Sequence, residues 1–205
     1  MTKEQVMTTA LDLFSQYGIK SVSMDDIARN IGISKRTIYE FFEDKETLLQ
    51  EAIKSYNNSM RSTLAELEKG PYTALDVFVL FYEDFMKRPR WYNKKYYDDL
   101  KRYPKALEQA EKDKADFTKR CIKLLNRGAK EGVFQKDVNI EILALLAKEQ
   151  LKMIRPSKTF LNHSVAEVFQ TVLFTFLRGI CTEKGLTILE RYALKHSQDI
   201  LLSEE

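Results

Sequence analysis

A short segment of the chain brings together cations and hydroxyl groups of the kind that proteins use to hold nucleic acid. Its polar members are Lys35, Arg36, Thr37 and Tyr39. Lysine and arginine donate to phosphates and to guanine edges, and hydroxyl groups donate to phosphates. The apolar members are Ile38, Phe41 and Phe42. At helical spacing the apolar side chains point inward, which leaves the polar ones on an open face that could bind DNA.

The residues before this segment predict how it is positioned. Ser23 can cap a first short helix, with the Asp26 carboxylate returning to the N–H of the cap. Gly32 ends that helix, because glycine adopts a positive φ at little cost. Ser34 caps a second short helix. Two short helices joined by a tight turn form a helix-turn-helix, whose second helix can enter a DNA major groove.

Charge supports this prediction only locally. Residues 1–50 contain six lysines or arginines and eight aspartates or glutamates, which gives a net charge of −2. Lys35, Arg36 and Lys45 nevertheless lie where a groove-entering helix would meet phosphates. Since non-specific affinity follows the number of phosphates neutralised, we expect it to be modest. The net charge of the whole chain is +3, which is too small to indicate a class of partner.

A longer pattern surrounds the helix-turn-helix, from Leu13 to Leu49. It has an aromatic-glycine end of the first helix, an Ile-Ala pair, a Gly-Ile-Ser-Lys turn and the run T-I-Y-x-F-F-x-x-K-x-x-L. The residues concerned are Phe14, Tyr17, Gly18, Ile27, Ala28, residues 32–35, Thr37, Ile38, Tyr39, Phe41, Phe42, Lys45 and Leu48. This combination resembles the DNA-binding domain of the TetR (tetracycline repressor) family of bacterial transcription regulators. It is far more specific than a helix-turn-helix pattern alone.

The resemblance implies roles for single positions. The implied phosphate contacts are Ser23, Thr37, Tyr39 and Lys45. Lys35 and Arg36 would approach base edges or backbone, and Ser34 completes the predicted DNA-binding set. Glu40 departs from the family pattern, in which a histidine or another neutral or basic residue is common. A carboxylate disfavours a phosphate, so Glu40 is not among the predicted contacts.

Composition is that of an ordinary globular chain. The 205 residues are 44% hydrophobic and 31% charged. The first ten residues lack the apolar core of a signal peptide, and the longest apolar runs, such as Ile142–Ala147, are too short to cross a bilayer. We therefore expect a cytoplasmic bacterial protein with no membrane partner.

No arrangement of residues indicates catalysis, a metal or a cofactor. Cys121 and Cys181 are far apart in apolar helical surroundings, and no Cys-x-x-Cys pair is present, so we expect reduced, buried thiols. His163 and His196 lie in polar end regions, and the chain lacks a glycine-rich phosphate loop. The sequence predicts no enzymatic activity, no metal and no cofactor.

Apolar residues recur at helical spacing between glycine and proline positions, and no strand-like alternation persists. We predict an all-α fold of about nine to ten helices. A helix-turn-helix DNA-binding domain is expected over residues 1–45 and a helical ligand-binding and dimerisation domain over residues 46–205. Asp44 opens one long helix that lasts to about Glu68. That helix is either a lever that moves the DNA-binding residues or a plain scaffold.

Aromatic residues gather in the segment 88–104 and on the helix predicted before it. Large aromatic side chains with polar ends suit a ligand pocket. The predicted ligand-binding residues are Tyr82, Phe85, Met86, Trp91, Tyr92, Tyr96, Phe117 and Cys121. Two other interpretations remain open: the aromatic residues could belong to a core or interface, or they could form a second nucleic-acid surface with the eight basic residues between Lys87 and Lys105.

Two predicted helices, over about 139–153 and 164–182, are apolar around more than one face. One apolar face packs in the chain's own core, so the remaining apolar surface needs another partner. In the resembled family the last two long helices form a four-helix bundle with a second subunit. The implied dimer residues are Leu146, Phe169, Leu173, Phe176, Leu177 and Ile180. Alternatively, a helix over residues 186–202 covers the remaining apolar surface within one chain.

The resemblance implies a homodimeric repressor that binds a palindromic operator in double-stranded DNA and is released by a small apolar or aromatic effector. Two alternatives remain open. A protein of the same fold could organise DNA, or answer to a protein partner, without any ligand. A helical enzyme or adaptor could retain the head as a relic, and it would then bind no specific DNA sequence.

Overall fold

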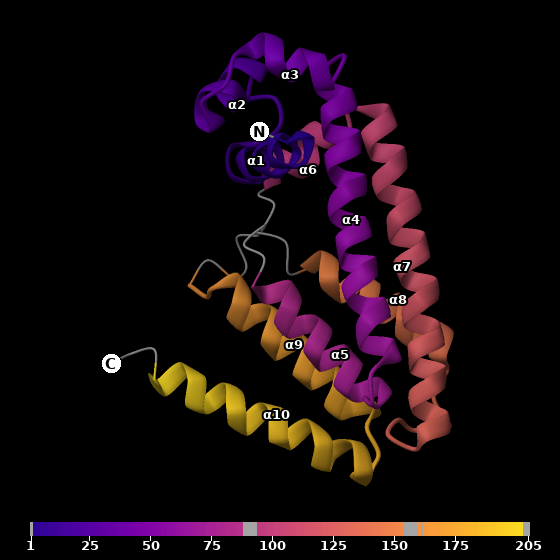
Figure 1. Cartoon of the computed structure of the whole chain (residues 1–205). Coiled ribbons are helices and arrows are strands. Elements are labelled where there is room, and N and C mark those ends of the chain that lie inside the picture. Colours follow the sequence, from indigo (N-terminus) through magenta and orange to yellow (C-terminus); the bar gives the residue numbers. More distant parts are fainter. Residues whose placement is uncertain (1, 88–93, 154–159, 161, 203–205) are drawn as a thin grey trace. The chain divides into compact units, whose positions relative to one another are not determined.

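The computed structural model describes residues 2–87, 94–153, 160 and 162–202, and these residues form ten α-helices (Figure 1). The helices are α1 (Lys3–Tyr17), α2 (Met24–Ile31), α3 (Lys35–Phe41), α4 (Lys45–Lys69), α5 (Ala74–Met86), α6 (Lys94–Leu100), α7 (Pro104–Glu131), α8 (Ile140–Met153), α9 (Val165–Ile180) and α10 (Glu183–Leu202). Extended pairing among the described residues is limited to an isolated bridge between Phe134 and Cys181. The all-α prediction is confirmed.

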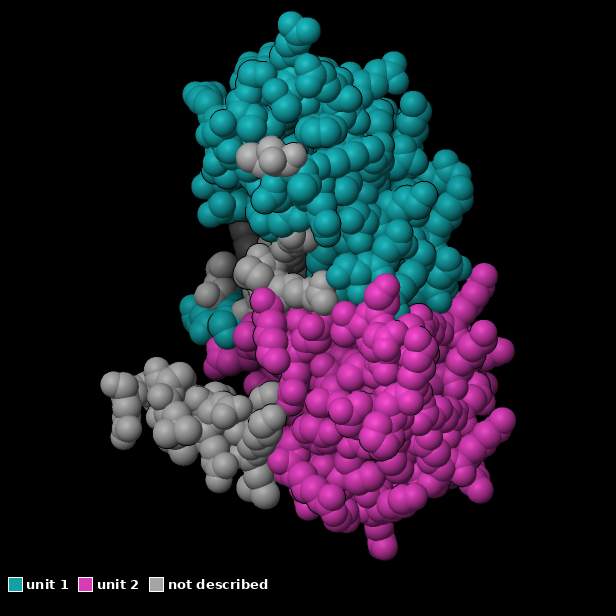
Figure 2. Space-filling view, viewed as in Figure 1, with its two compact units in different colours: residues 1–61, 89–117, 153–165 teal, residues 62–88, 118–152, 166–205 magenta. Residues whose placement is uncertain are grey.

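The chain divides into two compact units (Figure 2). Unit 1 comprises residues 1–61, 89–117 and 153–165, and unit 2 comprises residues 62–88, 118–152 and 166–205. Helices α4 and α7 therefore contribute their first part to unit 1 and their second part to unit 2. The boundary predicted at residue 45 separates residues by function, the binding of DNA, and not by compactness. It stays a prediction.

The core of unit 1 lies under the helix-turn-helix. Its fully buried side chains include Phe14 of α1, Ile27 of α2, Ile38 of α3 and Leu48 of α4. Phe42, which directly follows α3, is also fully buried. Helix α6 packs on α1 and adds Tyr96 and Leu100 to this core. Burial of these apolar surfaces holds the three short helices together, because none of them is long enough to be stable alone in water.

A buried carboxylate joins α4 to α7 within unit 1. Asp113 is 6% exposed and accepts hydrogen bonds from Asn57 Nδ2 at 2.8 Å, Gln109 Nε2 at 3.0 Å and an Nη of Arg61 at 2.5 Å. The same Arg61 guanidinium lies 3.3 Å from the exposed carboxylate of Asp116. A buried charge with three donors is satisfied, and removing it would leave those donors without their acceptor.

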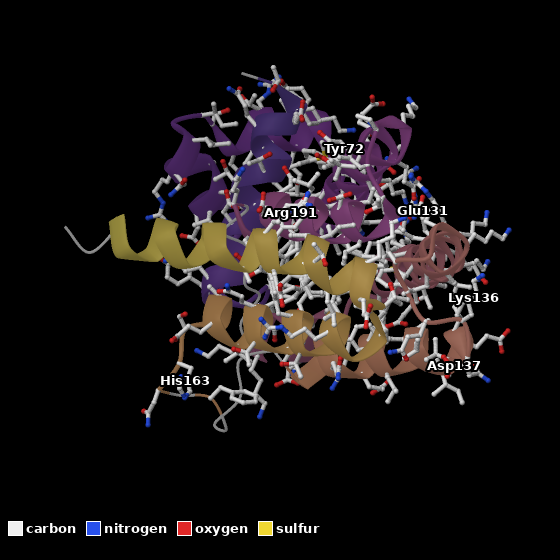
Figure 3. All side chains as sticks on the ribbon, turned by 90° about the horizontal axis from the view of Figure 1, so that it is seen from below. Tyr72, Glu131, Lys136, Asp137, His163 and Arg191 are labelled. Carbon is white, nitrogen blue, oxygen red and sulfur yellow. The ribbon has the colours of Figure 1, made fainter. Side chains whose placement is uncertain are left out.

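In unit 2, charged side chains of α7 bind the chain around the turn between α4 and α5. Arg120 pairs with Glu68 at 2.6 Å. Arg127 donates to Glu131 at 2.6 Å and to the Tyr72 carbonyl, and Glu131 accepts from the first backbone N–H of α5, at Ala74, at 2.7 Å. Tyr72 and Glu131 are labelled in Figure 3. Each end of this turn is thus fixed by a residue more than 50 positions away.

The last helix is attached to unit 2 by close backbone contact. A Cβ on Gly185 would lie 2.2 Å from the carbonyl oxygen of Val133, so no other residue fits there without a shift. Helix α10 then packs on α5, where the Tyr192 hydroxyl donates to the Asp76 carboxylate at 2.9 Å. Over the described residues, no helix has the length and apolar character needed to cross a membrane.

Candidate nucleic-acid interface

Local hydrogen bonds fix both ends of α2 and the start of α3. The Ser23 Oγ accepts from the Asp26 N–H at 3.1 Å, and the Asp26 carboxylate accepts from the Ser23 N–H at 2.8 Å, as predicted. Hydrogen bonds to the Asp26 carboxylate from the Ser23 hydroxyl and from the Ser23 N–H lower the pKa of Asp26. Gly32 ends α2 with φ of 72°, in the left-handed region that glycine adopts most easily. Ser34 caps α3 by accepting from the Thr37 N–H at 3.1 Å.

Burial then decides which face of α3 is open. Ile38 and Phe42 are fully buried, and the rings of Phe41 and Phe42 meet edge to face with 6.4 Å between their centroids. The opposite face is solvent-exposed, and it carries Lys35, Arg36, Tyr39 and Glu40. The structure therefore brings the predicted base-reading residues and the Tyr39 phenol onto one surface.

Charges on this surface are partly compensated within the protein. The Lys35 ammonium lies 2.9 Å from the Asp25 carboxylate, and this hydrogen bond raises the pKa of Lys35, which therefore stays protonated. Arg36 and Glu40 form a looser pair, with Nε 3.5 Å from Oε1. Because these pairs are exposed, each contributes little to stability, and DNA phosphates can compete for the cations.

Lys45 takes a different position from the other predicted contacts. Its ammonium donates to the Ile19 carbonyl and lies 5.5 Å from the centroid of the Phe14 ring. Burial lowers the pKa of Lys45, an effect that the nearby carboxylates of Asp99 and Asp26 oppose. A phosphate contact by Lys45 stays a prediction, and it requires the side chain to share or leave its bond to Ile19.

The predicted contacts at Ser23, Ser34 and Thr37 have their hydroxyls engaged in helix caps. The Ser23 hydroxyl donates to Asp26 at 2.6 Å, and the hydroxyls of Ser34 and Thr37 lie 2.9 Å apart. Tyr39 differs, because its side chain is 45% exposed and extends from the open face of α3. Among the predicted hydroxyl contacts, Tyr39 is therefore the one that can reach DNA without giving up a cap.

The fold and this surface together define a helix-turn-helix protein whose second helix presents two cations, a phenol and a carboxylate. The profile described as "Bacterial regulatory proteins, tetR family" matches residues 6–52. The chain is similar to IcaR of Staphylococcus aureus (strain Newman), an HTH-type negative transcriptional regulator of a biofilm operon, with 23% identity over 84 residues. That alignment covers 41% of this chain and spans 45% of the length of IcaR.

A longer similarity links the chain to the HTH-type transcriptional repressor KstR2 of Rhodococcus jostii (strain RHA1), with 21% identity over 83% of this chain and 88% of KstR2. A TetR-family regulator from Agrobacterium tumefaciens has the same fold, with a TM-score of 0.74, 16% identity, and coverage of 88% of this chain and 97% of that one. Residues 6–52 thus form a DNA-binding domain of the TetR family of bacterial regulatory proteins. This family is one of regulators, in agreement with the prediction that the chain is not an enzyme.

The residues predicted to bind a ligand fall into two groups. Within unit 2, Tyr82 stacks on Phe169 with 5.3 Å between the ring centroids and an angle of 10° between the planes. Phe85 lies 5.6 Å from Phe169, and Phe174 meets Tyr82 edge to face at 6.4 Å. We call Tyr82, Phe85, Phe169 and Phe174 the aromatic cluster of unit 2. Met86 is half-buried at the end of the same helix, α5.

The other predicted ligand residues lie elsewhere. Tyr96 is buried in the core of unit 1, and Phe117 also belongs to unit 1. Cys121 is half-buried in α7, and burial raises the pKa of its thiol to about 12, so it is protonated at neutral pH. Cys181 is buried, and both thiols are free, as the sequence predicts. Trp91 and Tyr92 lie outside the described residues.

The residues predicted at a dimer interface differ in exposure. Leu146 is exposed on α8, next to the exposed Ile142 and Leu145. Leu173 and Phe176 are half-buried on α9, whereas Leu177 and Ile180 are buried by their own chain. Phe169 stacks on Tyr82, so it belongs to the aromatic cluster. The dimer interface stays a prediction, and of its six residues Leu146 is the one a second chain can contact most directly.

Sequence reasoning missed three features. Phe174, whose ring meets that of Tyr82, was not among the predicted ligand residues, and its spacing of five from Phe169 does not place the two on one helix face. The pairing of Asp25 with Lys35 joins α2 to α3, and no pattern in the sequence indicated it. The contact of Asp99 with the Lys20 N–H, at 2.7 Å, links residues 79 positions apart and depends on the packing of α6 on α1.

Proposed function

We propose that this chain is an effector-responsive transcriptional repressor that binds a palindromic operator as a homodimer. The observation that carries the proposal is the open face of α3, where Lys35, Arg36 and Tyr39 are exposed while Ile38 and Phe42 anchor the helix from below. A recognition helix of this kind reads base edges in a major groove and binds the adjacent phosphates. The sign of regulation follows that of the similar proteins IcaR and KstR2, a negative regulator and a repressor.

Dimerisation is supported by the apolar surface of α8. Ile142, Leu145 and Leu146 are 54%, 55% and 49% exposed, and they are adjacent on the helix. Burying such side chains against a second copy removes apolar surface from water, which is a favourable driving force for association. A two-fold symmetric dimer presents two α3 helices, so its operator is expected to be palindromic, with half-sites about one helical turn apart or a multiple of it.

Effector binding is supported by the aromatic cluster of unit 2. Its rings offer a large apolar surface, and the Tyr82 hydroxyl gives it a polar end. These features favour a small apolar or aromatic effector. In this proposal the head over residues 1–45 binds DNA and the body over residues 46–205 binds the effector and the second subunit. The effector releases DNA by stabilising a state with lower operator affinity.

Operator binding is tested by selecting bound DNA from a random duplex pool at fixed, near-physiological salt. We expect a palindromic consensus. Tyr39→Phe should weaken binding to all selected sequences alike, because the phenol binds a phosphate and carries no base information. An effect of Tyr39→Phe confined to one base position would contradict that role. Absence of any enriched sequence from a folded protein would favour the relic-head or DNA-organising alternatives.

Dimerisation is tested by sedimentation of Leu146→Glu. A carboxylate within a buried apolar interface is unfavourable, so we expect this variant to become monomeric and to lose operator affinity. Ser62→Glu is the control, because it adds the same charge at an exposed position of α4 in unit 2. A wild-type protein that is monomeric at micromolar concentration, or a Leu146→Glu variant that stays dimeric, would exclude this interface.

The effector site is tested by a thermal-shift screen of small apolar and aromatic compounds. A compound that stabilises the wild type should also release the operator. Phe85→Leu should remove the shift, whereas Phe78→Leu should retain it, because Phe78 pairs with Phe134 outside the aromatic cluster. Equal loss in both variants would place the compound elsewhere. A screen in which stabilising compounds never release DNA would favour the ligand-independent alternative.

A further inference from the structure

The open face of α3 carries one group that should oppose DNA binding. Glu40 is exposed, and a duplex presents about one negative charge per 1.7 Å of its axis, so a carboxylate on this face is repelled unless it finds a donor. The two neighbouring carboxylates on α2 are engaged within the protein: Asp25 with Lys35, and Asp26 with Ser23 and Arg29. Glu40 is thus the carboxylate of α3 that faces outward toward a bound duplex.

The contact between Arg36 and Glu40 leaves useful groups open on both side chains. Nε of Arg36 lies 3.5 Å from Oε1 of Glu40, while the Arg36 side chain is 90% exposed. This contact involves Nε, and the exposure of the side chain leaves the two Nη groups accessible as donors. An exposed pair four residues apart contributes little to stability. Stabilisation of α3 therefore does not explain why Arg36 and Glu40 are paired on this face.

A major-groove edge offers a match for these groups. A G·C base pair presents two acceptors, N7 and O6 of guanine, followed by one donor, the N4 amino group of cytosine. Arg36 supplies two donors, and Glu40 supplies an acceptor beside them. We propose that the Arg36–Glu40 pair reads one G·C base pair in each half-site, with Arg36 on guanine and Glu40 on the cytosine amino group. This inference rests on the proposed operator binding.

In this arrangement Glu40 provides specificity more than affinity. Replacing cytosine by thymine substitutes the O4 acceptor for the N4 donor, and a carboxylate facing an acceptor is repelled. Phosphate contacts by Lys35 and Tyr39 act on every sequence alike, so they cannot compensate for this difference. The wild type is therefore expected to tolerate little variation at this base pair while it tolerates more at others.

The test repeats the duplex selection with the wild type, Glu40→Ala, Arg36→Ala and Glu43→Ala. Both single substitutions in the pair should keep the palindrome and lose preference at the same G·C base pair, by about tenfold each. Glu43→Ala is the matched control, because it removes an exposed carboxylate just beyond α3 and should leave every base preference unchanged. It also reports the general gain in affinity from removing one negative charge.

An atomic version of the test replaces that cytosine by 2-pyrimidinone, which lacks the amino group. Affinity of the wild type should fall about tenfold, and affinity of Glu40→Ala should be unchanged by the replacement. An unaltered consensus for Glu40→Ala, or changes at different base pairs for Glu40→Ala and Arg36→Ala, would overturn the inference. A wild type that selects no consensus fails at operator binding itself, and the inference falls with it.

Discussion

Polar contacts in the helix-turn-helix and in unit 2 differ in how far they reach along the chain. In the helix-turn-helix, Ser23 and Asp26 are three residues apart, as are Ser34 and Thr37. In unit 2, Glu68 and Arg120 are 52 residues apart, and Asp76 and Tyr192 are 116 apart. The caps of the first region depend on neighbours in sequence, whereas these contacts of the second join residues that meet only when the chain has folded.

This difference has an energetic consequence. A local cap contributes about 1 kcal/mol and can form in an isolated segment. A distant contact must overcome the conformational entropy of closing a long loop, so it depends on the surrounding core being already in place. Substitutions at distant contacts should therefore cost more free energy of unfolding than substitutions at caps. The first three of the following measurements test this.

The largest effect is expected at Asp113, whose carboxylate joins residues 52 to 56 positions away. Asp113→Ala removes the acceptor of three donors, and we expect a loss of about 3 kcal/mol in the free energy of unfolding, at the lower end for a buried pair because Arg61 is partly exposed. Urea unfolding measures it. Asp116→Ala, on the same helix with an exposed carboxylate, should cost well under about 1 kcal/mol. Equal costs would remove the distinction between the two contacts.

A smaller effect is expected at Gly185, where α10 begins. In Gly185→Ala the new Cβ meets the Val133 carbonyl, and overpacking of this kind costs about 1–3 kcal/mol. The melting temperature should fall by several degrees. Gly179→Ala is the control, because no atom lies within 4 Å of its Cβ position and alanine favours a helix. A melting temperature for Gly185→Ala at or above the wild-type value would show that this junction can relax freely.

Removing a local cap should cost less free energy of unfolding than either of these substitutions. Ser23→Ala removes the side-chain acceptor of the α2 cap, and we expect a loss of about 1 kcal/mol. Ser21→Ala, an identical change in the exposed turn just before α2, should be close to neutral. If Ser23→Ala proves as costly as Asp113→Ala, then the local and distant contacts do not differ as argued. Operator affinity of the same variant also tests the predicted phosphate contact of Ser23.

The smallest effect concerns pH. Burial raises the pKa of the Cys121 thiol from about 9 to about 12, so above pH 9 the unfolded chain loses a proton that the folded chain retains. The stabilising contribution is complete below pH 9 and is lost progressively as pH rises from 9 to 12. Cys121→Ala should therefore show a shallower fall of melting temperature over pH 9–11. Parallel curves for the two proteins would mean that the thiol is not shielded from water.

The helix-turn-helix was predictable in detail from the sequence. Caps at Ser23 and Ser34, the break at Gly32, and the inward Ile38 and Phe42 all follow from local patterns, and the structure confirms them. Bounds of the longer helices were also close, as for α4, predicted from Asp44 to about Glu68 and observed over Lys45–Lys69, because apolar periodicity persists over many residues. Such features depend on sequence neighbours, so no knowledge of packing is needed to predict them.

Predictions that depended on distant packing were less complete. Tyr96 and Tyr82 were both predicted to bind a ligand, yet one is buried in the core of unit 1 and the other lies in the aromatic cluster of unit 2. Periodicity gives the buried face of a helix but not the element that covers it. The position of Lys45 follows the same rule, since its inward bond depends on the loop that carries Ile19.

By itself, the sequence determined the all-α fold and the helix-turn-helix, because caps, breaks and apolar stripes act between residues a few positions apart. Its motif from Leu13 to Leu49 also carried the resemblance to the DNA-binding domain of a family of regulators. Only the tertiary structure decided which aromatic side chains meet, which cations on and beside α3 stay open to DNA, and how Asp113 is satisfied. These outcomes depend on contacts across long loops, whose partners become neighbours only when burial of the apolar faces brings the helices together.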